Sequence, residues 1–192
     1  EHEGVCPIYL VDYPIATSAL AADILREPVM QGRAEIGIQL HPWVNPPHDE
    51  VVNEVNSYVG NLPRELEKAK FVRLRTAIER NFETVPQIYR AGRYGLGPNT
   101  ADILRENGIA MDSSVRSKFD YSAMGGVDYR HHPLIPYWVD SERALLELPL
   151  TTVFWGLLRR HGDALYPMLW RIPSLRGLLA RLGLLERIPL TP

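Results

Sequence analysis

Short apolar runs alternate with amphipathic segments along the first part of the chain. Residues 5–11 and 36–40 are apolar runs of strand length and are expected to lie in a buried sheet. Residues 17–31 predict a helix from the spacing of Leu20, Ile24 and Leu25. This helix is expected to end or kink near Glu27, because Pro28 lacks the N–H that a helix needs. Strand, helix and strand in this order predict a βαβ unit with a parallel sheet.

The same alternation continues over the next eighty residues. Residues 63–82 predict a long helix with an inward apolar stripe of Phe71, Leu74, Ile78 and Phe82. We interpret its charged remainder as a solvated outer face, made of Arg64, Glu65, Glu67, Lys68 and Lys70. Short strands are predicted at 87–90 and 109–111, with a helix at 100–107 between them.

The pattern changes in the last third of the chain. Residues 145–154 predict a strand interrupted by Pro149. Residues 155–188 are predicted to be helical, with leucines toward the sheet and arginines outward. We interpret this segment as a helix pair that covers the sheet. A basic amphipathic helix lying on a membrane surface is the alternative.

Composition narrows the class of protein. The chain has 192 residues, of which 45% are hydrophobic, so residues 1–192 can form a single domain with a sizeable core. A formal net charge of -2 gives no electrostatic footprint for nucleic acid. No apolar run is long enough for a transmembrane span, and no signal peptide precedes Glu1. The single cysteine, Cys6, fits a reducing compartment, so a cytoplasmic location is expected.

Candidate chemistry gathers where the predicted strands end. His41 closes the run 36–40 and is followed by Pro42 and Trp43 in a proline-rich loop. Ligands bind at the carboxyl ends of parallel strands, and a neutral imidazole there can hold a metal or move a proton. A packed structural histidine is the alternative. Asp12 ends the first strand and is expected either to cap a turn or to face the same site.

Three pieces in chain order carry a family resemblance. They are EIGIQLHPW at 35–43, YRAGRYG at 89–95 and DSS at 112–114. Together they resemble the polysaccharide deacetylases, the NodB-homology carbohydrate esterases, and most nearly the branch associated with surface-polysaccharide and O-antigen synthesis. The resemblance covers about residues 4–155. It implies an α/β fold in the form of an irregular (β/α) barrel, which the helical segment 155–188 would cover.

The resemblance also implies an activity. Members of this family use a divalent metal, most often zinc, to hydrolyse the acetyl group from an N-acetylated sugar. It makes His41 a metal ligand and Arg90 a catalytic residue that orients the base. The residues that it places beside the carbohydrate are Asp12, Trp43, Arg93, Tyr94 and Asp112.

This sequence departs from the family pattern at several places. The first metal histidine is replaced by Gly37, or by Gln39 in a variant spacing, and His48 is a minor substitute. The family's aspartate pair belongs before Val5 and its late histidine after Pro192, so the sequence is expected to be clipped at both ends of the domain. A catalytically inactive deacetylase-like domain that binds a glycan or a protein is therefore the alternative function, and a purely structural α/β domain is a third.

Overall fold

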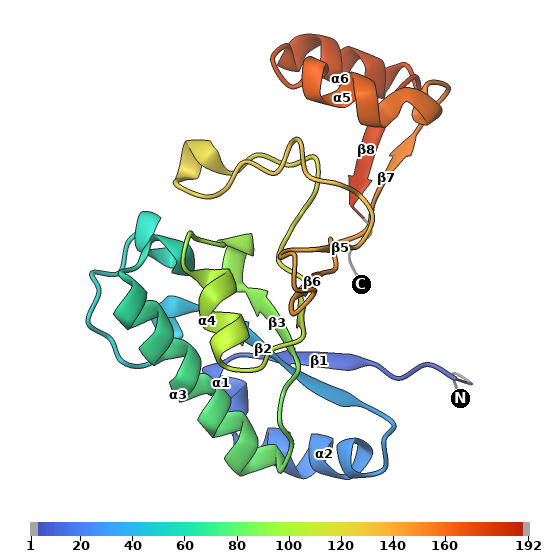
Figure 1. The fold of residues 1–192 in the computed structure, drawn as a ribbon. Coiled ribbons are helices and arrows are strands. Elements are labelled where there is room, and N and C mark those ends of the chain that lie inside the picture. The colour runs from blue at the N-terminus through green and yellow to red at the C-terminus, as the bar shows by residue number, and fades with distance from the viewer. Residues whose placement is uncertain (1–3, 190–192) are drawn as a thin grey trace.

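Parallel strands and helices alternate along the chain, as the hydrophobic pattern predicts (Figure 1). The computed structural model describes residues 4–189. One sheet has the order β1-β2-β3-β4-β6-β5, in which only β5 is antiparallel to its neighbour. The elements are β1 (Ile8–Val11), α1 (Tyr13–Ala16), α2 (Ala19–Met30), β2 (Glu35–Leu40), α3 (Arg64–Phe82), β3 (Ile88–Ala91), α4 (Thr100–Glu106), β4 (Met111–Asp112), β5 (Tyr137–Trp138), β6 (Leu146–Glu147), β7 (Thr152–Trp155), α5 (Gly162–Leu169), α6 (Pro173–Arg181) and β8 (Glu186–Pro189).

Within residues 4–189, the helices that pack on the six-stranded sheet lie on one of its faces. Its single core joins residues of α1, α2, α3 and α4 to strand residues that share one face. Those strand residues are Val11, Ile36, Ile38, Leu40, Tyr89 and Ala91. Within residues 4–189 the sheet is open, with β1 and β5 at its edges, so the expected closed barrel is not present there. The α/β class and the parallel sheet are confirmed.

The predicted helix 17–31 is α2 (Ala19–Met30), and the short helix α1 before it was not predicted. Asp12 caps α1 by accepting a hydrogen bond from Ile15 N at 3.2 Å, and Ser18 caps α2 by accepting one from Ala21 N. The expected end near Glu27 is wrong, because α2 continues to Met30 with Pro28 inside it. The N–H of Gln31 still bonds to Glu27 O, which closes the last turn around the proline.

The expected solvated face of α3 is wrong at two positions, because Glu67 and Lys70 are buried. Lys70 Nζ donates to the carbonyl oxygens of Pro42, Asn45 and Pro47 at 3.0, 2.6 and 2.5 Å. It also lies 2.9 Å from Glu50 Oε1. A buried ammonium is tolerated when it is paired and fully hydrogen-bonded, and here the loop that follows His41 supplies the partners.

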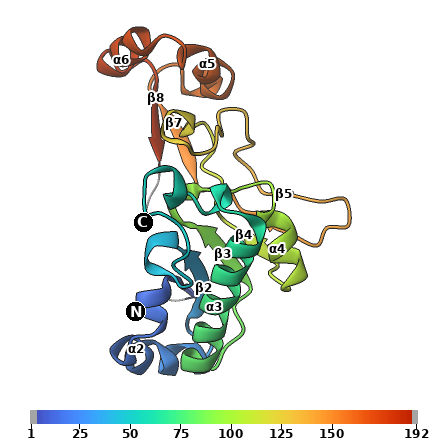
Figure 2. The same ribbon diagram turned by 90° about the vertical axis from the view of Figure 1, so that its left-hand side faces the viewer.

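The segment 155–188 does not cover the six-stranded sheet. Its helices α5 and α6 lie beside a separate antiparallel pair, β7 and β8, at one end of the molecule (Figures 1 and 2). The strand β8 was not predicted. Arg187 on β8 donates to Lys118 O at 2.5 Å and stacks over Phe119, which ties this unit to the loop after β4. That residues 1–192 form one domain stays a prediction, and residues 1–3 and 190–192 lie outside the described residues.

Two glycines let loops cross beside the site. A Cβ on Gly97 would lie 2.2 Å from Gly60 O, and one on Gly60 would lie 2.2 Å from Gly97 N. Gly60 N also donates to Gly95 O at 2.9 Å. The glycine-rich turn after β3 is therefore locked onto the turn that precedes α3.

Candidate functional site

The carboxyl ends of β1, β2 and β3 bring polar residues to the sheet face opposite the helices α1 to α4. Gln39 and Arg90 are register partners, and Val11 pairs with Ile38. Side chains alternate along strands, so Gln39 and Arg90 share the face opposite the core. Asp12 follows β1 at the same end of the sheet. The structure thus brings His41 and Arg90 to the carboxyl ends of two neighbouring strands, β2 and β3, as the sequence predicts.

His41 directly follows β2 and stacks on Trp43, with ring centroids 4.7 Å apart. Burial lowers the pKa of the imidazole, and the nearby Asp12 carboxylate opposes this shift. Nε2 is enclosed by protein and has no hydrogen-bond partner among the residues described. Gly92 makes room for the ring, because a Cβ there would lie 2.5 Å from His41 Cδ2. The imidazole is therefore neutral at pH 7 and held against the turn after β3.

Arg90 is fixed by the chain after β4. Its Nε donates to Ser113 O at 2.9 Å and its Nη2 to Ser113 Oγ at 3.1 Å. Burial lowers the pKa of this guanidinium, while Tyr94, Asp112 and Glu147 raise it. Arginine remains charged despite such shifts. Among residues 4–189 no carboxylate forms a hydrogen bond with Arg90, so its role in orienting a base aspartate stays a prediction.

Arg93 and Tyr94 form a strained turn, with backbone φ angles of 55° and 61° that residues other than glycine rarely adopt. Arg93 donates to Ser57 Oγ at 2.5 Å and lies 4.5 Å over the Tyr58 ring, so its charge is directed toward the preceding loop. The ring of Tyr94 lies 5.8 Å from that of Tyr121. The structure therefore uses Arg93 to hold the turn and leaves Tyr94 within an aromatic cluster.

Asp112 belongs to a separate site on the helix-covered face. It pairs in register with Glu147, so the two carboxyl groups lie on the same face of neighbouring strands. Burial raises the pKa of Asp112 to about 6, and burial with the charge of Asp112 raises that of Glu147 to about 9. Both line a cavity of about 290 Å³ with His132 and Tyr137. Sequence reasoning missed Glu147, although a single acidic residue within an apolar run indicates a buried carboxyl group.

The donor atoms do not fit a zinc ion. Catalytic zinc sites use three protein ligands, whereas this edge offers one imidazole and the Asp12 carboxylate. The described part of the chain holds no group of three His, Cys, Asp or Glu side chains that could bind a metal. His48 is exposed on the loop. Because fewer than three such ligands gather here within residues 4–189, no reaction step is derived through a metal.

Comparison with known proteins supports the fold. No protein-family model matches the sequence, and no curated protein matches it. A solved structure described as a "putative polysaccharide deacetylase from Mycobacterium smegmatis" is similar, with a TM-score of 0.53 and 20% sequence identity. The match covers 77% of this chain and 41% of that one, so the chain spans about two fifths of its length. The chain shares its α/β fold with a protein described as a polysaccharide deacetylase.

Proposed function

We propose that the chain acts in deacetylase chemistry, hydrolysing the acetamide of an N-acetylated sugar in a polysaccharide. The observation that carries this proposal is that Asp12, His41 and Arg90 lie at the carboxyl ends of three adjacent parallel strands. The shared fold supports it. The wider role implied by the sequence motifs, in O-antigen or other surface-glycan synthesis, is part of the same proposal.

The residues present suit three tasks in this reaction. Water adds to the acetamide carbonyl carbon, the C–N bond breaks, the nitrogen takes up a proton, and acetate and the sugar amine leave. The neutral imidazole of His41 is assigned the transfer of the proton. The guanidinium of Arg90 is assigned the stabilisation of negative charge on the carbonyl oxygen. Trp43 offers an aromatic face for a sugar ring.

A second candidate is glycan binding without hydrolysis. The lack of a three-ligand metal cluster within residues 4–189 favours it, because hydrolysis in this family depends on a metal. The same edge of the sheet would then hold the carbohydrate through Trp43 and Arg90.

Acetate release and binding should be measured together on N-acetylglucosamine oligomers, with and without added zinc. Acetate release that falls by about 10²-fold or more in His41→Ala would support hydrolysis, with the exposed His48→Ala as the matched control. Arg90→Lys is expected to lose activity to a similar extent with little change in stability. Binding without acetate release under either condition would select the second candidate. If neither carbohydrate binding nor acetate release is detected, both candidate functions are contradicted.

A further inference from the structure

We propose that α5 and α6, with the strands β7 and β8 that carry them, form a docking unit for an anionic lipid surface. The unit stands away from the six-stranded sheet in both views (Figures 1 and 2). No helix of the described chain is long and apolar enough to cross a membrane. The contact proposed is therefore one in the plane of the bilayer surface. This inference does not depend on the proposed catalytic activity.

Charge is distributed unevenly between this unit and the rest of the chain. Residues 155–189 contain six arginines and two acidic residues, a formal charge of +4, whereas the other residues carry -6 of the chain total of -2. Such a separation directs one end of the molecule toward a negatively charged surface and the other end away from it. The complementarity favours anionic phospholipid as the partner.

The basic unit also exposes apolar side chains. Leu175 and Leu178 on α6 and Leu182 at its C-cap recur at spacings of three and four, so they form one stripe, and all three are exposed. Met168 near the end of α5 and Ile172 at the N-cap of α6 are also exposed. Leu157 and Trp155 add to this surface from β7 and the turn after it. Apolar side chains beside arginines match the boundary between lipid headgroups and acyl chains.

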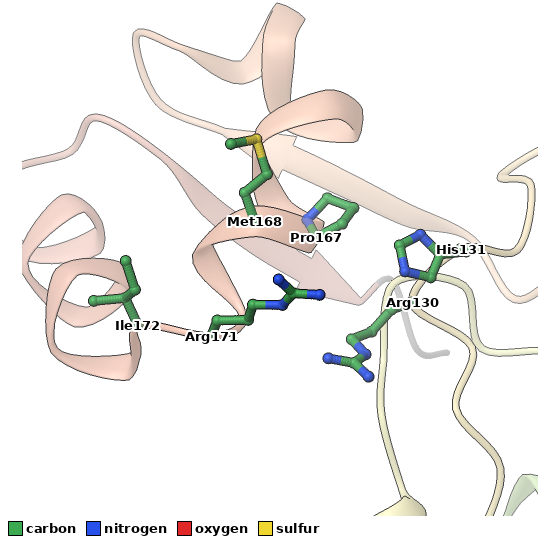
Figure 3. A pocket seen from close by; sticks show the side chains of 6 residues that line it. All are labelled: Arg130, His131, Pro167, Met168, Arg171 and Ile172. Carbon is green, nitrogen blue, oxygen red and sulfur yellow. The ribbon is translucent and has the colours of Figure 1, made fainter.

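A cavity of about 350 Å³ lies where α5 meets the loop at Arg130 and His131 (Figure 3). Arg171 lines it beside Met168 and Ile172, so cationic and apolar groups meet in one hollow. Arg130 is already paired with Asp128, at 2.6 Å. The available charge in the cavity is therefore that of Arg171, which suits the phosphate of a lipid headgroup.

Several arginines of the unit have no task within the fold. Arg187 and Arg176 stack on aromatic rings. In contrast, Arg160, Arg171 and Arg181 are exposed, and the structure of residues 4–189 shows no hydrogen bond or ion pair from their side chains. Their charge remains available to a partner.

Flotation of the full chain with phosphatidylcholine vesicles, prepared with and without phosphatidylglycerol, tests the proposal. Binding is expected only with phosphatidylglycerol and is expected to weaken at high salt. The double variant Arg171→Glu/Arg181→Glu should lower partitioning at least about twentyfold, since each arginine near an anionic surface contributes about fivefold. Leu178→Asp/Leu182→Asp should also abolish binding.

Matched controls lie on the exposed faces of other helices. Arg73→Glu/Arg80→Glu on α3 and Leu20→Asp/Ile24→Asp on α2 should leave vesicle binding within about twofold of the unaltered protein. Circular dichroism verifies that each variant is folded. Equal binding to neutral vesicles, or no vesicle binding with Leu178-dependent dimerisation in solution, would overturn the proposal.

Discussion

Asp112 and Glu147 face each other across β4 and β6, and both are buried from solvent. Glu147 keeps its proton well above neutral pH, because burial and the neighbouring carboxylate both disfavour a second charge. Its Oε1 also accepts a hydrogen bond from Val115 N at 3.0 Å, which anchors the loop after β4. The same carboxyl group that holds the proton therefore also holds the loop after β4 in place.

Glu147→Gln should flatten the dependence of stability on pH. The pKa of Glu147 rises on folding from near 4.5 to about 9, so the folded state holds a proton that the unfolded state releases. Stability from this group is thus fully present below pH 4.5 and falls as pH rises toward 9, by up to about 1.4 kcal/mol per pH unit. Glutamine keeps the acceptor for Val115 and does not titrate. Urea unfolding at pH 5 and 8.5 measures the difference.

The exposed Glu65→Gln is the control for this change and should leave the pH profile as it is. A Glu147→Gln protein whose stability still falls between pH 5 and 8.5 as steeply as that of the unaltered chain would show that the carboxyl pair does not hold the proton.

Lys70→Met should destabilise the fold by about 3–5 kcal/mol, because it leaves three loop carbonyls and the Glu50 carboxylate buried without their partner. Chemical denaturation provides the measurement. Lys68→Met is the matched control on the same helix. Its ammonium pairs with Glu106 at the surface, so the change should cost no more than about 1 kcal/mol.

A double variant separates the two parts of this effect. Adding Glu50→Gln to Lys70→Met removes the unpaired buried charge and should restore part of the lost stability. Equal costs for Lys70→Met and Lys68→Met would mean that the ammonium does not hold the loop.

Gly97→Ala should cost about 1–3 kcal/mol, since the new methyl group would meet the Gly60 carbonyl oxygen at 2.2 Å. Gly177→Ala is the natural comparison, because that glycine lies within α6 with nothing within 4 Å of a Cβ. This second change should stabilise by up to about 1 kcal/mol through helix propensity. Thermal unfolding of both variants tests the close crossing. A Gly97→Ala variant with unchanged stability would exclude this close crossing.

Gln39→His should raise the affinity for zinc by at least about tenfold, because it adds an imidazole on the same side of the sheet as His41 and completes three ligands with Asp12. Isothermal titration calorimetry with zinc measures the change. Gln31→His, placed at the end of α2, controls for a surface histidine. The same zinc affinity in both variants would argue that residues 12, 39 and 41 do not converge.

Much of the architecture follows from local pattern. The run 36–40 and the helix 63–82 are found close to where periodicity places them, and parallel pairing then brings His41 near Arg90. The burial of Glu67 and Lys70 disagrees with their charge but agrees with their spacing along α3. Both residues recur with Phe71 and Leu74 on the inward stripe, so the period of the helix carried the signal.

Other features depend on partners that are distant in sequence. Lys70 is satisfied by carbonyls more than twenty residues earlier, and no local pattern reveals such a pairing. Glu147 is tolerated in its strand only because Asp112 stands opposite on another strand. The segment 155–188 was expected to cover the sheet because its leucines suggested a core-facing side, whereas the chain uses a separate strand pair to support the helices.

The contact between Gly60 and Gly97 has a consequence for engineering. The turn after β3 and the turn before α3 must be replaced together, although they are far apart in the sequence. Grafting the turn that carries Arg93 onto another protein would require the segment that contains Gly60 as well.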